Sequence, residues 1–328
     1  MTSNIEEKLI ATGIKEQSAK IYLSHYNRLI KGAFKNEAPE NMISDENVDV
    51  ITEYLKNGGF SSNTKSMFMR SWKKIAEVNE VKGDYSKIDK KIKEYNDETA
   101  YATPTEKEQK NKIDKSYIIK IRDQYKKKLS DTFTSSDTYY LLLCLYTYLP
   151  PLRSEDYYNT IIKDDDTDEV NDNFYDLDKK QLILNKYKTM KTHGKRTIDV
   201  PDELHDIIKA FHEKSGSNLL ICNGAKNKFN AISMNIAFGR CLKKKVSSGM
   251  LRKCHISSNI DTGMSAQDRK NEARIMGHTL AVQQLTYSKF SDVLHPDKMD
   301  LQYLARRHQQ LTEQLNEVND LIRNLELK

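Results

Sequence analysis

The sequence has few glycines and cysteines and no long apolar run. Its 12 glycines include no GxGxxG or GxxxxGK[ST] arrangement, so the phosphate loops of NAD and ATP enzymes are not expected. The four cysteines, Cys144, Cys222, Cys241 and Cys254, lie too far apart for a typical zinc site or disulfide scaffold. No stretch approaches the roughly 18 apolar residues of a membrane helix, and the N-terminus lacks the regions of a signal peptide. We therefore expect plain thiols, no metal, and an intracellular protein without a membrane partner.

The net charge is modest, but it is unevenly distributed. The 328 residues carry 53 Lys and Arg against 47 Asp and Glu, a balance of +6. Residues 154–178 hold ten acids and one base, whereas residues 186–253 hold fifteen bases and five acids, a local charge of +10. A basic block inside a folded region is typical of a phosphate-binding surface.

The length predicts two domains. Apolar residues recur at spacings of three and four through residues 1–95, which predicts a helical N-terminal domain. Residues 96–112 have almost no large apolar side chains and contain Pro104, so they are predicted to be a linker. The second domain is predicted for residues 113–295.

Within the first domain, residues 61–63 are a candidate N-cap for a helix that buries Phe68, Trp72 and Ile75. The opposite face of this helix is basic. Two interpretations stay open for that face: a solvated surface, or a DNA-contacting surface made by Lys65, Arg70, Lys73 and Lys74.

The second domain is predicted to be mainly helical with one small antiparallel β-hairpin, an α+β class. Helices are expected over residues 117–129, 137–149, from 202, and over 227–243, 248–259 and 266–276. Residues 182–184 and 197–200 are expected to be strands joined by a lysine-rich turn, and the acidic run 164–172 is expected to be a loop.

A heptad pattern occupies residues 300–328. Apolar side chains alternate there in steps of three and four, with His308 as the polar exception, at Leu301, Leu304, Leu311, Leu315, Val318, Ile322 and Leu325. This period predicts a coiled-coil helix for self-association, and the alternative is one helix that folds back on its own domain.

Three strings are candidates for a catalytic site. The first, PPLRSED at residues 150–156, places Arg153 at a helix start and Asp156 three residues later. The second, GMLRK at residues 249–253, places Arg252 at another helix start. The third, IMGH, ends at His278 and is followed nine residues later by Tyr287.

Read together, the strings resemble the tyrosine recombinase (phage-type integrase) superfamily over about residues 115–290. They are most similar to the integrases of large DNA viruses, virophages and related mobile elements. The resemblance implies catalytic roles for the two arginines, a hairpin lysine as general acid, the late histidine and the tyrosine nucleophile: Arg153, Arg252, Lys188, His278 and Tyr287. It also implies that Asp156 supports Arg153, with Lys191 as the alternate lysine.

The resemblance implies a C-clamp of two domains around double-stranded DNA. It further implies site-specific cleavage and rejoining through a 3′-phosphotyrosine, without metal, ATP or cofactor. The protein would act as a homo-oligomer, a dimer on one site and a tetramer in synapsis, in a prokaryotic cytoplasm, a nucleus or a viral factory. The DNA contacts expected in the second domain are Lys186, Lys195, Arg196, Lys243, Lys244, Lys245 and Lys253.

One position departs from the family. Gly249 stands three residues before Arg252, where the family usually has His or Lys, so the proton acceptor for the tyrosine is unassigned. Gly249 therefore keeps one alternative open, a catalytically impaired DNA-binding protein. Two others stay open for different reasons: a type IB topoisomerase-like enzyme, which shares the same catalytic residue types, and a coiled-coil scaffold with an incidental basic patch.

Overall fold

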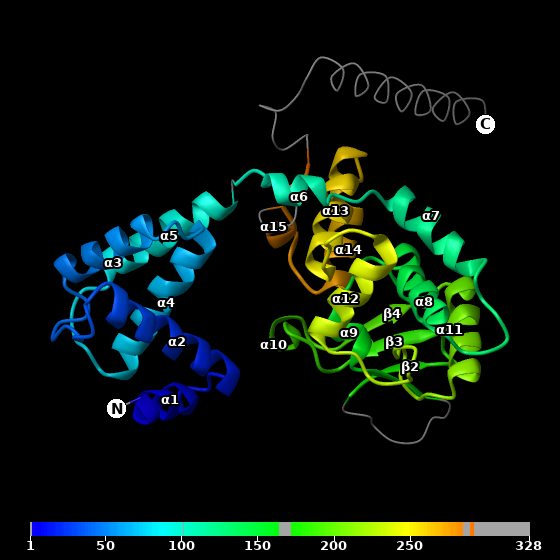
Figure 1. Ribbon diagram of the computed structural model, residues 1–328, viewed down its shortest axis with the longest axis horizontal. Helices are drawn as coiled ribbons and strands as arrows, with labels where there is room; N and C mark the ends of the chain where they lie inside the picture. The colour runs from blue at the N-terminus through cyan, green and yellow to red at the C-terminus, as the bar shows by residue number, and fades with distance from the viewer. Residues whose placement is uncertain (1, 101, 164–171, 285–288, 292–328) are drawn as a thin grey trace, which may run out of the picture. The chain divides into compact units, whose positions relative to one another are not determined.

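The computed structural model describes residues 2–100, 102–163, 172–284 and 289–291 (Figure 1). The chain divides into two compact units, residues 1–102 and residues 103–328. No helix in the described part of the chain is long and apolar enough to cross a membrane. The heptad segment 300–328 and most of the acidic run, residues 164–171, lie outside the described residues, so the coiled coil stays a prediction.

Unit 1 is helical, as the apolar spacing predicts. Its helices in the described residues are α1 (Thr2–Ala11), α2 (Glu16–Gly32), α3 (Asp45–Asn57), α4 (Ser62–Val78) and α5 (Ser86–Ala100). Ser61 caps α4, because its side chain accepts a hydrogen bond from the backbone N–H of Thr64 at 3.3 Å. Helix α4 buries Phe68 and Trp72, and the Trp72 indole N–H donates to the Met42 carbonyl at 2.7 Å.

The predicted linker, residues 96–112, contains more helix than its polar composition indicates. Helix α5 continues to Ala100, and Asn96 accepts a hydrogen bond from Ser66 of α4 at 2.7 Å. Thr105 and Glu108 form a capping box that starts the short helix α6 (Glu106–Lys110). Apolar periodicity does not detect these segments, because hydrogen bonds between polar groups help to stabilise them.

Unit 2 combines helices with one small sheet, and this agrees with the predicted mainly helical α+β class. After α6, its helices in the described residues are α7 (Lys115–Lys126), α8 (Ser135–Tyr148), α9 (Ser154–Tyr158), α10 (Met190–His193), α11 (Asp202–Ser215), α12 (Ala231–Leu242), α13 (Ser248–Asp261), α14 (Ala266–Met276) and α15 (Leu280–Val282). Its strands are β1 (Thr160–Lys163), β2 (Asn173–Asp176), β3 (Gln181–Leu184) and β4 (Arg196–Asp199).

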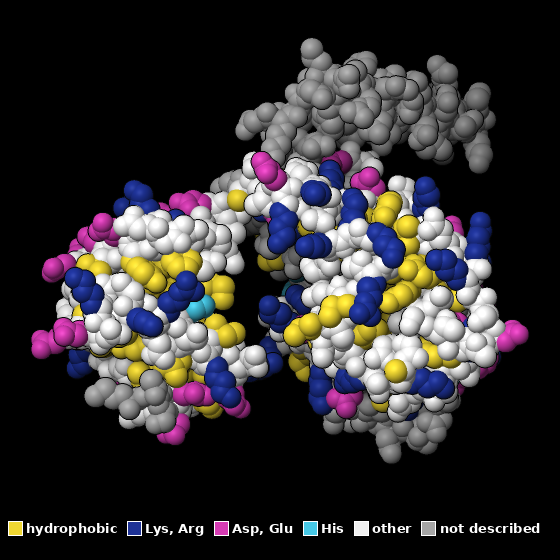
Figure 2. All heavy atoms as spheres, viewed as in Figure 1, with side chains coloured by type: hydrophobic (Ala, Val, Ile, Leu, Met, Phe, Trp, Pro, Cys, Tyr) yellow, Lys and Arg dark blue, Asp and Glu magenta, His cyan; other side chains and the backbone are white. Residues whose placement is uncertain are grey.

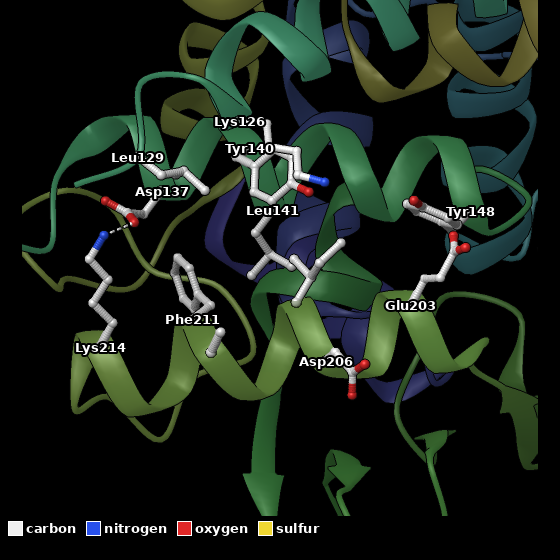
Figure 3. Close-up of a pocket in the computed structure, with 12 residues that line it drawn as sticks. Lys126, Leu129, Asp137, Tyr140, Leu141, Tyr148, Glu203, Asp206, Phe211 and Lys214 are labelled. Carbon is white, nitrogen blue, oxygen red and sulfur yellow. Dashed lines mark hydrogen bonds and ion pairs between the residues drawn. The ribbon is translucent and has the colours of Figure 1, made fainter. Parts of the chain in front are cut away.

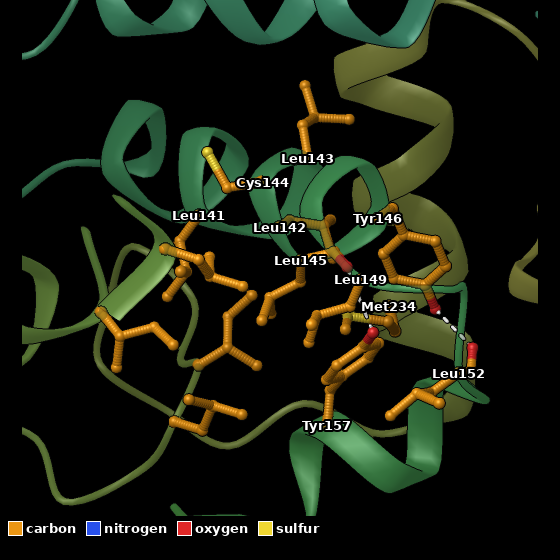
Figure 4. Packing of buried hydrophobic residues seen from close by; sticks show 14 of the residues in the cluster. Leu141, Leu142, Leu143, Cys144, Leu145, Tyr146, Leu149, Leu152, Tyr157 and Met234 are labelled. Carbon is orange, nitrogen blue, oxygen red and sulfur yellow. Dashed lines mark hydrogen bonds between the residues drawn. The ribbon is translucent and has the colours of Figure 1, made fainter. Parts of the chain in front are cut away.

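Helix α8 lies in the core of unit 2 (Figure 4). Residues 141–145 are at most 1% exposed, so this part of α8 is covered by other elements on all sides. The hydroxyl of Tyr146 donates to the carbonyl of Leu152 at 3.1 Å, and the hydroxyl of Tyr157 donates to an α8 carbonyl at 3.2 Å. These two bonds hold the turn that leads into Arg153 against the core.

The sheet is mixed, and it extends the predicted antiparallel hairpin of β3 and β4 by two strands. Its order is β1-β2-β3-β4; β3 pairs antiparallel with β2 and β4, whereas β1 and β2 are parallel. The two predicted strands are confirmed as β3 and β4. The sequence pattern misses β1 and β2 because they flank the acidic run and tertiary contacts support them: the backbone N–H of Ile162, for example, donates to the Asn218 carbonyl at 2.7 Å.

Candidate active site

Arg153 stands at the start of α9, where the sequence predicts it. Its guanidinium is half-buried, and its Nη1 atom, which is buried, has no hydrogen-bond partner among the described residues. A buried guanidinium nitrogen without a partner is unfavourable in water-free surroundings. An oxyanion that entered the site would satisfy it with a charge-assisted hydrogen bond.

Asp156 contacts Arg153, the partner that the resemblance implies, and also a second arginine, Arg196. Its Oδ2 atom lies 3.4 Å from Nη2 of Arg196 and 3.3 Å from the backbone nitrogen of Arg153. Both partners of the ion pair are buried, with 0% and 5% of their side chains exposed. Burial raises the pKa of Asp156 and lowers that of Arg196, and the attraction between the two charges only partly offsets this. Asp156 therefore supports the Arg153 backbone and, in addition, the Arg196 side chain.

Arg252, which is 1% exposed, joins three segments of unit 2. From α13, its Nη1 atom donates to the Pro151 carbonyl at 3.1 Å. Its Nη1 and Nη2 atoms lie 3.4 and 3.3 Å from the Met276 carbonyl. Because Pro151 precedes Arg153 by two residues and Met276 precedes His278 by two, Arg252 fixes the backbone that carries both predicted catalytic side chains.

His278 lies directly after Gly277, the left-handed C-cap of α14 with φ of 70°. It is 5% exposed, and its ring Nδ1 donates to the Ala273 carbonyl at 3.3 Å. Burial is the largest cause that lowers the pKa of His278 to about 3, followed by the nearby positive charges of Arg252, Arg153, His193 and Arg196. The structure thus gathers Arg153, Arg252 and His278 in one place, with a neutral imidazole at physiological pH.

The turn between β3 and β4 carries Lys188 and Lys191 and is tied to the same place. The Thr189 hydroxyl donates to the Gly277 carbonyl at 2.8 Å, next to His278. Both lysine side chains are exposed, and no hydrogen bond or ion pair with another described residue holds either of them. The choice between Lys188 and Lys191 as general acid stays open.

Arg196 is buried rather than displayed on the DNA-contacting surface, which corrects its predicted role. It begins β4, and Ile198 and Val200 follow it at alternate positions. Alternate residues of a strand point to the same face, and burial along β4 alternates accordingly. The same alternation in the sequence was a signal that Arg196 shares the buried face of β4.

Tyr287, the predicted nucleophile, lies outside the described residues. Residues 289–291, which follow it, are held by unit 2. Phe290 is 2% exposed, and its backbone N–H donates to the Ser257 hydroxyl of α13 at 3.0 Å. The Lys289 ammonium pairs with the Glu108 carboxylate of α6 at 2.7 Å. The chain is therefore anchored to α13 and α6 two residues after the predicted nucleophile.

The two basic residues that follow Gly249 on α13 do not replace the missing acceptor. Lys253 pairs with Glu108 at 3.3 Å, and Nε2 of His255 lies 2.7 Å from the Glu272 carboxylate. Both side chains are engaged with acids away from Arg252. Lys253, predicted to contact DNA, therefore has its charge only partly offset within the protein, because it shares Glu108 with Lys289.

The remaining predicted DNA contacts of unit 2 lie at its surface. Lys186 pairs with Asp172 at 2.7 Å, and the Lys244 ammonium donates to the Lys112 carbonyl at 2.8 Å. The other three side chains are exposed, namely Lys195, Lys243 and Lys245. Their contacts with DNA stay predictions.

The basic face of α4 in unit 1 is partly neutralised. Lys73 pairs with Asp89 at 2.6 Å and Lys74 pairs with Glu77 at 3.2 Å. Lys65 lies over the Tyr95 ring at 5.6 Å and Arg70 is exposed, so these two are better placed to contact phosphate. In Figure 2, Lys and Arg side chains are distributed over the visible face of each unit with apolar patches between them.

A hollow in unit 2 lies apart from the predicted catalytic residues, between α8 and α11 (Figure 3). Tyr140, Leu141 and Phe211 line it, and an ion pair between Asp137 and Lys214 closes one end. None of the predicted site residues contributes to its lining. Among the described residues, no cluster of three or more His, Cys, Asp or Glu side chains has the arrangement of a metal site.

No protein-family model and no curated protein sequence matches the chain. Two solved integrases are similar in structure. The Tn1549 transposon integrase, solved in complex with transposon right-end DNA, covers 95% of this chain and 99% of its own at 15% identity, with a TM-score of 0.57. A lambda integrase dimer bound to a COC′ core site covers 87% and 94% at 13% identity, with a TM-score of 0.56.

The chain has the fold of these two integrases. At such low identities the agreement concerns the fold alone. The chemistry of the site has to be argued from its own side chains.

Proposed function

We propose that the protein is a site-specific recombinase that cleaves and rejoins double-stranded DNA through a 3′-phosphotyrosine intermediate. The observation that carries the proposal is the gathering of Arg153, Arg252 and His278 from three distant segments in an integrase fold. Both solved integrases are bound to DNA, which supports duplex DNA as the substrate.

The arginines suit the transition state of this reaction. The Tyr287 oxygen attacks the phosphorus, the Tyr–O–P bond forms, and the bond from phosphorus to the 5′ oxygen breaks. Negative charge grows on the nonbridging oxygens, and fixed guanidinium groups stabilise it. The buried Nη1 of Arg153 is a donor without a partner in the described residues, so it is the first candidate to bind that charge.

Two protons move in this step. The tyrosine loses its phenolic proton to solvent water, because no residue of the site is assigned as its acceptor. The departing 5′ oxygen gains a proton from Lys188 or Lys191 of the β3–β4 turn. His278 is neutral in the free protein because it is buried among cations. A bound phosphate offsets those cations, which favours protonation of the imidazole and a hydrogen bond to a nonbridging oxygen. The phosphotyrosine ester stores the bond energy, so rejoining needs no ATP.

Helical unit 1 supplies a second DNA-binding surface in this proposal, through Lys65 and Arg70.

Residues 300–328 join protomers into dimers and tetramers in this proposal. Deletion of residues 301–328 tests the assembly. We expect the shortened protein to bind a single site with nearly unchanged affinity but to sediment as a smaller species. Unchanged sedimentation would contradict the coiled-coil proposal.

A second candidate function rests on Gly249. A protein that lacks the usual base at this position is a DNA-binding protein with weak or no cleavage. A Cβ at Gly249 meets no atom closer than 3.7 Å, so a larger side chain has room at its base. Faster adduct formation by Gly249→His than by Gly249→Ala would identify the missing base as the limiting group.

The decisive experiment traps the covalent intermediate. The full chain is incubated with a pool of duplexes of randomised sequence that carry bridging phosphorothiolates, and any adduct is mapped by mass spectrometry. We expect an adduct on Tyr287, its loss in Tyr287→Phe, and its retention in Tyr303→Phe, the next tyrosine along the chain. Absence of an adduct in the native chain, or an undiminished one in Tyr287→Phe, would contradict the proposal. Sequence-independent relaxation of supercoils by monomers would favour the topoisomerase-like alternative.

A further inference from the structure

We infer that Arg196 is a positioning residue. Its buried guanidinium contacts the segments that carry Arg153, His278 and the lysine turn, and it keeps these three segments in position relative to one another. The inference rests on the proposed function and adds a residue to the predicted catalytic set. Arg196 is 6% exposed, so its side chain is built into the protein rather than offered to the surface.

The first contact is with α9. Nη2 of Arg196 lies 3.4 Å from Oδ2 of Asp156, and the same oxygen lies 3.3 Å from the backbone nitrogen of Arg153. Because Asp156 is fully buried, Arg196 is the cation that offsets its charge. The start of α9, and with it the Arg153 side chain, is therefore held through Asp156.

The second contact is with the end of α14. Nη1 of Arg196 donates to the Ile275 carbonyl at 2.5 Å. Gly277, which follows Ile275 by two residues, lies so close that a Cβ on it would be 2.8 Å from Nη1. The turn that presents His278 is thus packed directly against the Arg196 guanidinium.

The third contact is with the turn between β3 and β4. The Arg196 guanidinium carbon lies 3.8 Å from the centroid of the Tyr187 ring. Tyr187 immediately precedes Lys188, and its hydroxyl donates to the Gly194 carbonyl at 2.5 Å at the other end of the turn. Stacking on Arg196 therefore fixes the segment that carries both candidate general acids.

A lysine cannot make these three contacts together. The guanidinium is planar and directs two terminal nitrogens to different acceptors while its face stacks on a ring, whereas an ammonium is a compact point charge. Arg196→Lys keeps a positive charge available to Asp156, so it is the variant most expected to fold. Lys209→Met is the matched control, because it removes a charge from an exposed residue of α11 that belongs to neither the predicted site nor the predicted DNA contacts.

The first measurement separates DNA binding from cleavage. We expect Arg196→Lys to bind duplex DNA with a Kd within about threefold of the native value. At saturating DNA its single-turnover rate of adduct formation should fall about 100-fold, because small misplacements of catalytic groups cost this much. Lys209→Met should leave that rate unchanged. A native rate in Arg196→Lys, or a loss explained entirely by weaker binding, would overturn the inference.

The second measurement does not depend on cleavage. Hydrogen exchange in Arg196→Lys should accelerate at residues 154–158, 187–193 and 276–280 by about threefold or more, as local opening becomes easier. Faster exchange confined to β4 would overturn the inference even if adduct formation slowed. A native protein that forms no adduct contradicts the proposed function alone, since the exchange measurement still decides whether Arg196 holds the three segments.

Discussion

Gly277 and Arg196 approach each other so closely that no side chain fits between them: a Cβ on Gly277 would lie 2.8 Å from Nη1 and 3.0 Å from the guanidinium carbon of Arg196. Gly277 also has φ of 70°, in the left-handed region that favours glycine. The Arg196 guanidinium thus packs directly against the end of α14. The substitution Gly277→Ala, which adds one methyl group, tests this contact.

Gly277→Ala is expected to destabilise the protein by about 2–4 kcal/mol, the sum of backbone strain and the displaced guanidinium. Gly216→Ala is the matched control, because Gly216 has φ of 62° but no atom within 4 Å of its Cβ position. The control should lose only about 1 kcal/mol. Urea denaturation of both variants measures the difference, and equal losses would mean that the contact with Arg196 contributes nothing.

The two predicted catalytic arginines should respond differently to substitution. Arg153→Ala should slow cleavage by raising the activation barrier by about 3 kcal/mol or more. It should change the stability little, because the Nη1 atom of Arg153 has no partner in the described residues. Arg252→Ala should lose cleavage and also about 2–3 kcal/mol of stability, since the carbonyls of Pro151 and Met276 lose their donor. Single-turnover rates and thermal unfolding check both effects. An equal collapse of DNA binding would make these affinity residues instead.

His278 should make the free protein sensitive to acid. Its pKa is about 3 in the folded protein against 6.5 in the unfolded chain, so the unfolded chain binds the proton more readily. The stability is fully present above pH 6.5 and is lost as the pH falls toward 3, by roughly 5 kcal/mol at most. Urea denaturation at a series of pH values should show a steep slope in the native protein and a flatter one in His278→Asn. Parallel slopes would contradict the buried neutral imidazole.

Glu108 should couple α6 to the chain that follows Tyr287. Burial opposes its ionisation, but the hydrogen bonds from Lys289 and the Thr105 backbone and the charge of Lys253 outweigh it, and the pKa of Glu108 falls to about 2. Its contribution to stability is therefore present above pH 4.5 and lost as the pH falls toward 2.

Glu108→Gln should cost about 1–2 kcal/mol at neutral pH, because these pairs are only partly buried. It should also accelerate hydrogen exchange at residues 289–291. Glu106→Gln, an exposed residue of the same helix, is the control and should change neither quantity. Exchange that is unchanged at residues 289–291 in Glu108→Gln would show that the ion pairs do not hold this segment.

Local patterns in the sequence were sufficient for most elements. The α14 range of 266–276 was predicted to the residue, because Ser265 caps its start and Gly277 ends it in the left-handed conformation. Strands β1 and β2 were missed, since strands that flank an acidic run carry little apolar pattern and these two are stabilised by partners elsewhere in the chain.

The sequence by itself determined which residue types were available for the chemistry: two arginines at helix starts, a histidine after a glycine, and a lysine-rich turn between two strands. Only the tertiary structure decided their partners. Asp156 pairs with Arg196 in addition to bonding the Arg153 backbone, and Lys253 faces Glu108. The physical reason is that a buried charge must find an opposite charge or a carbonyl within a few ångströms, and residues such as Asp156 and Arg196, 40 positions apart, become neighbours only when the chain folds.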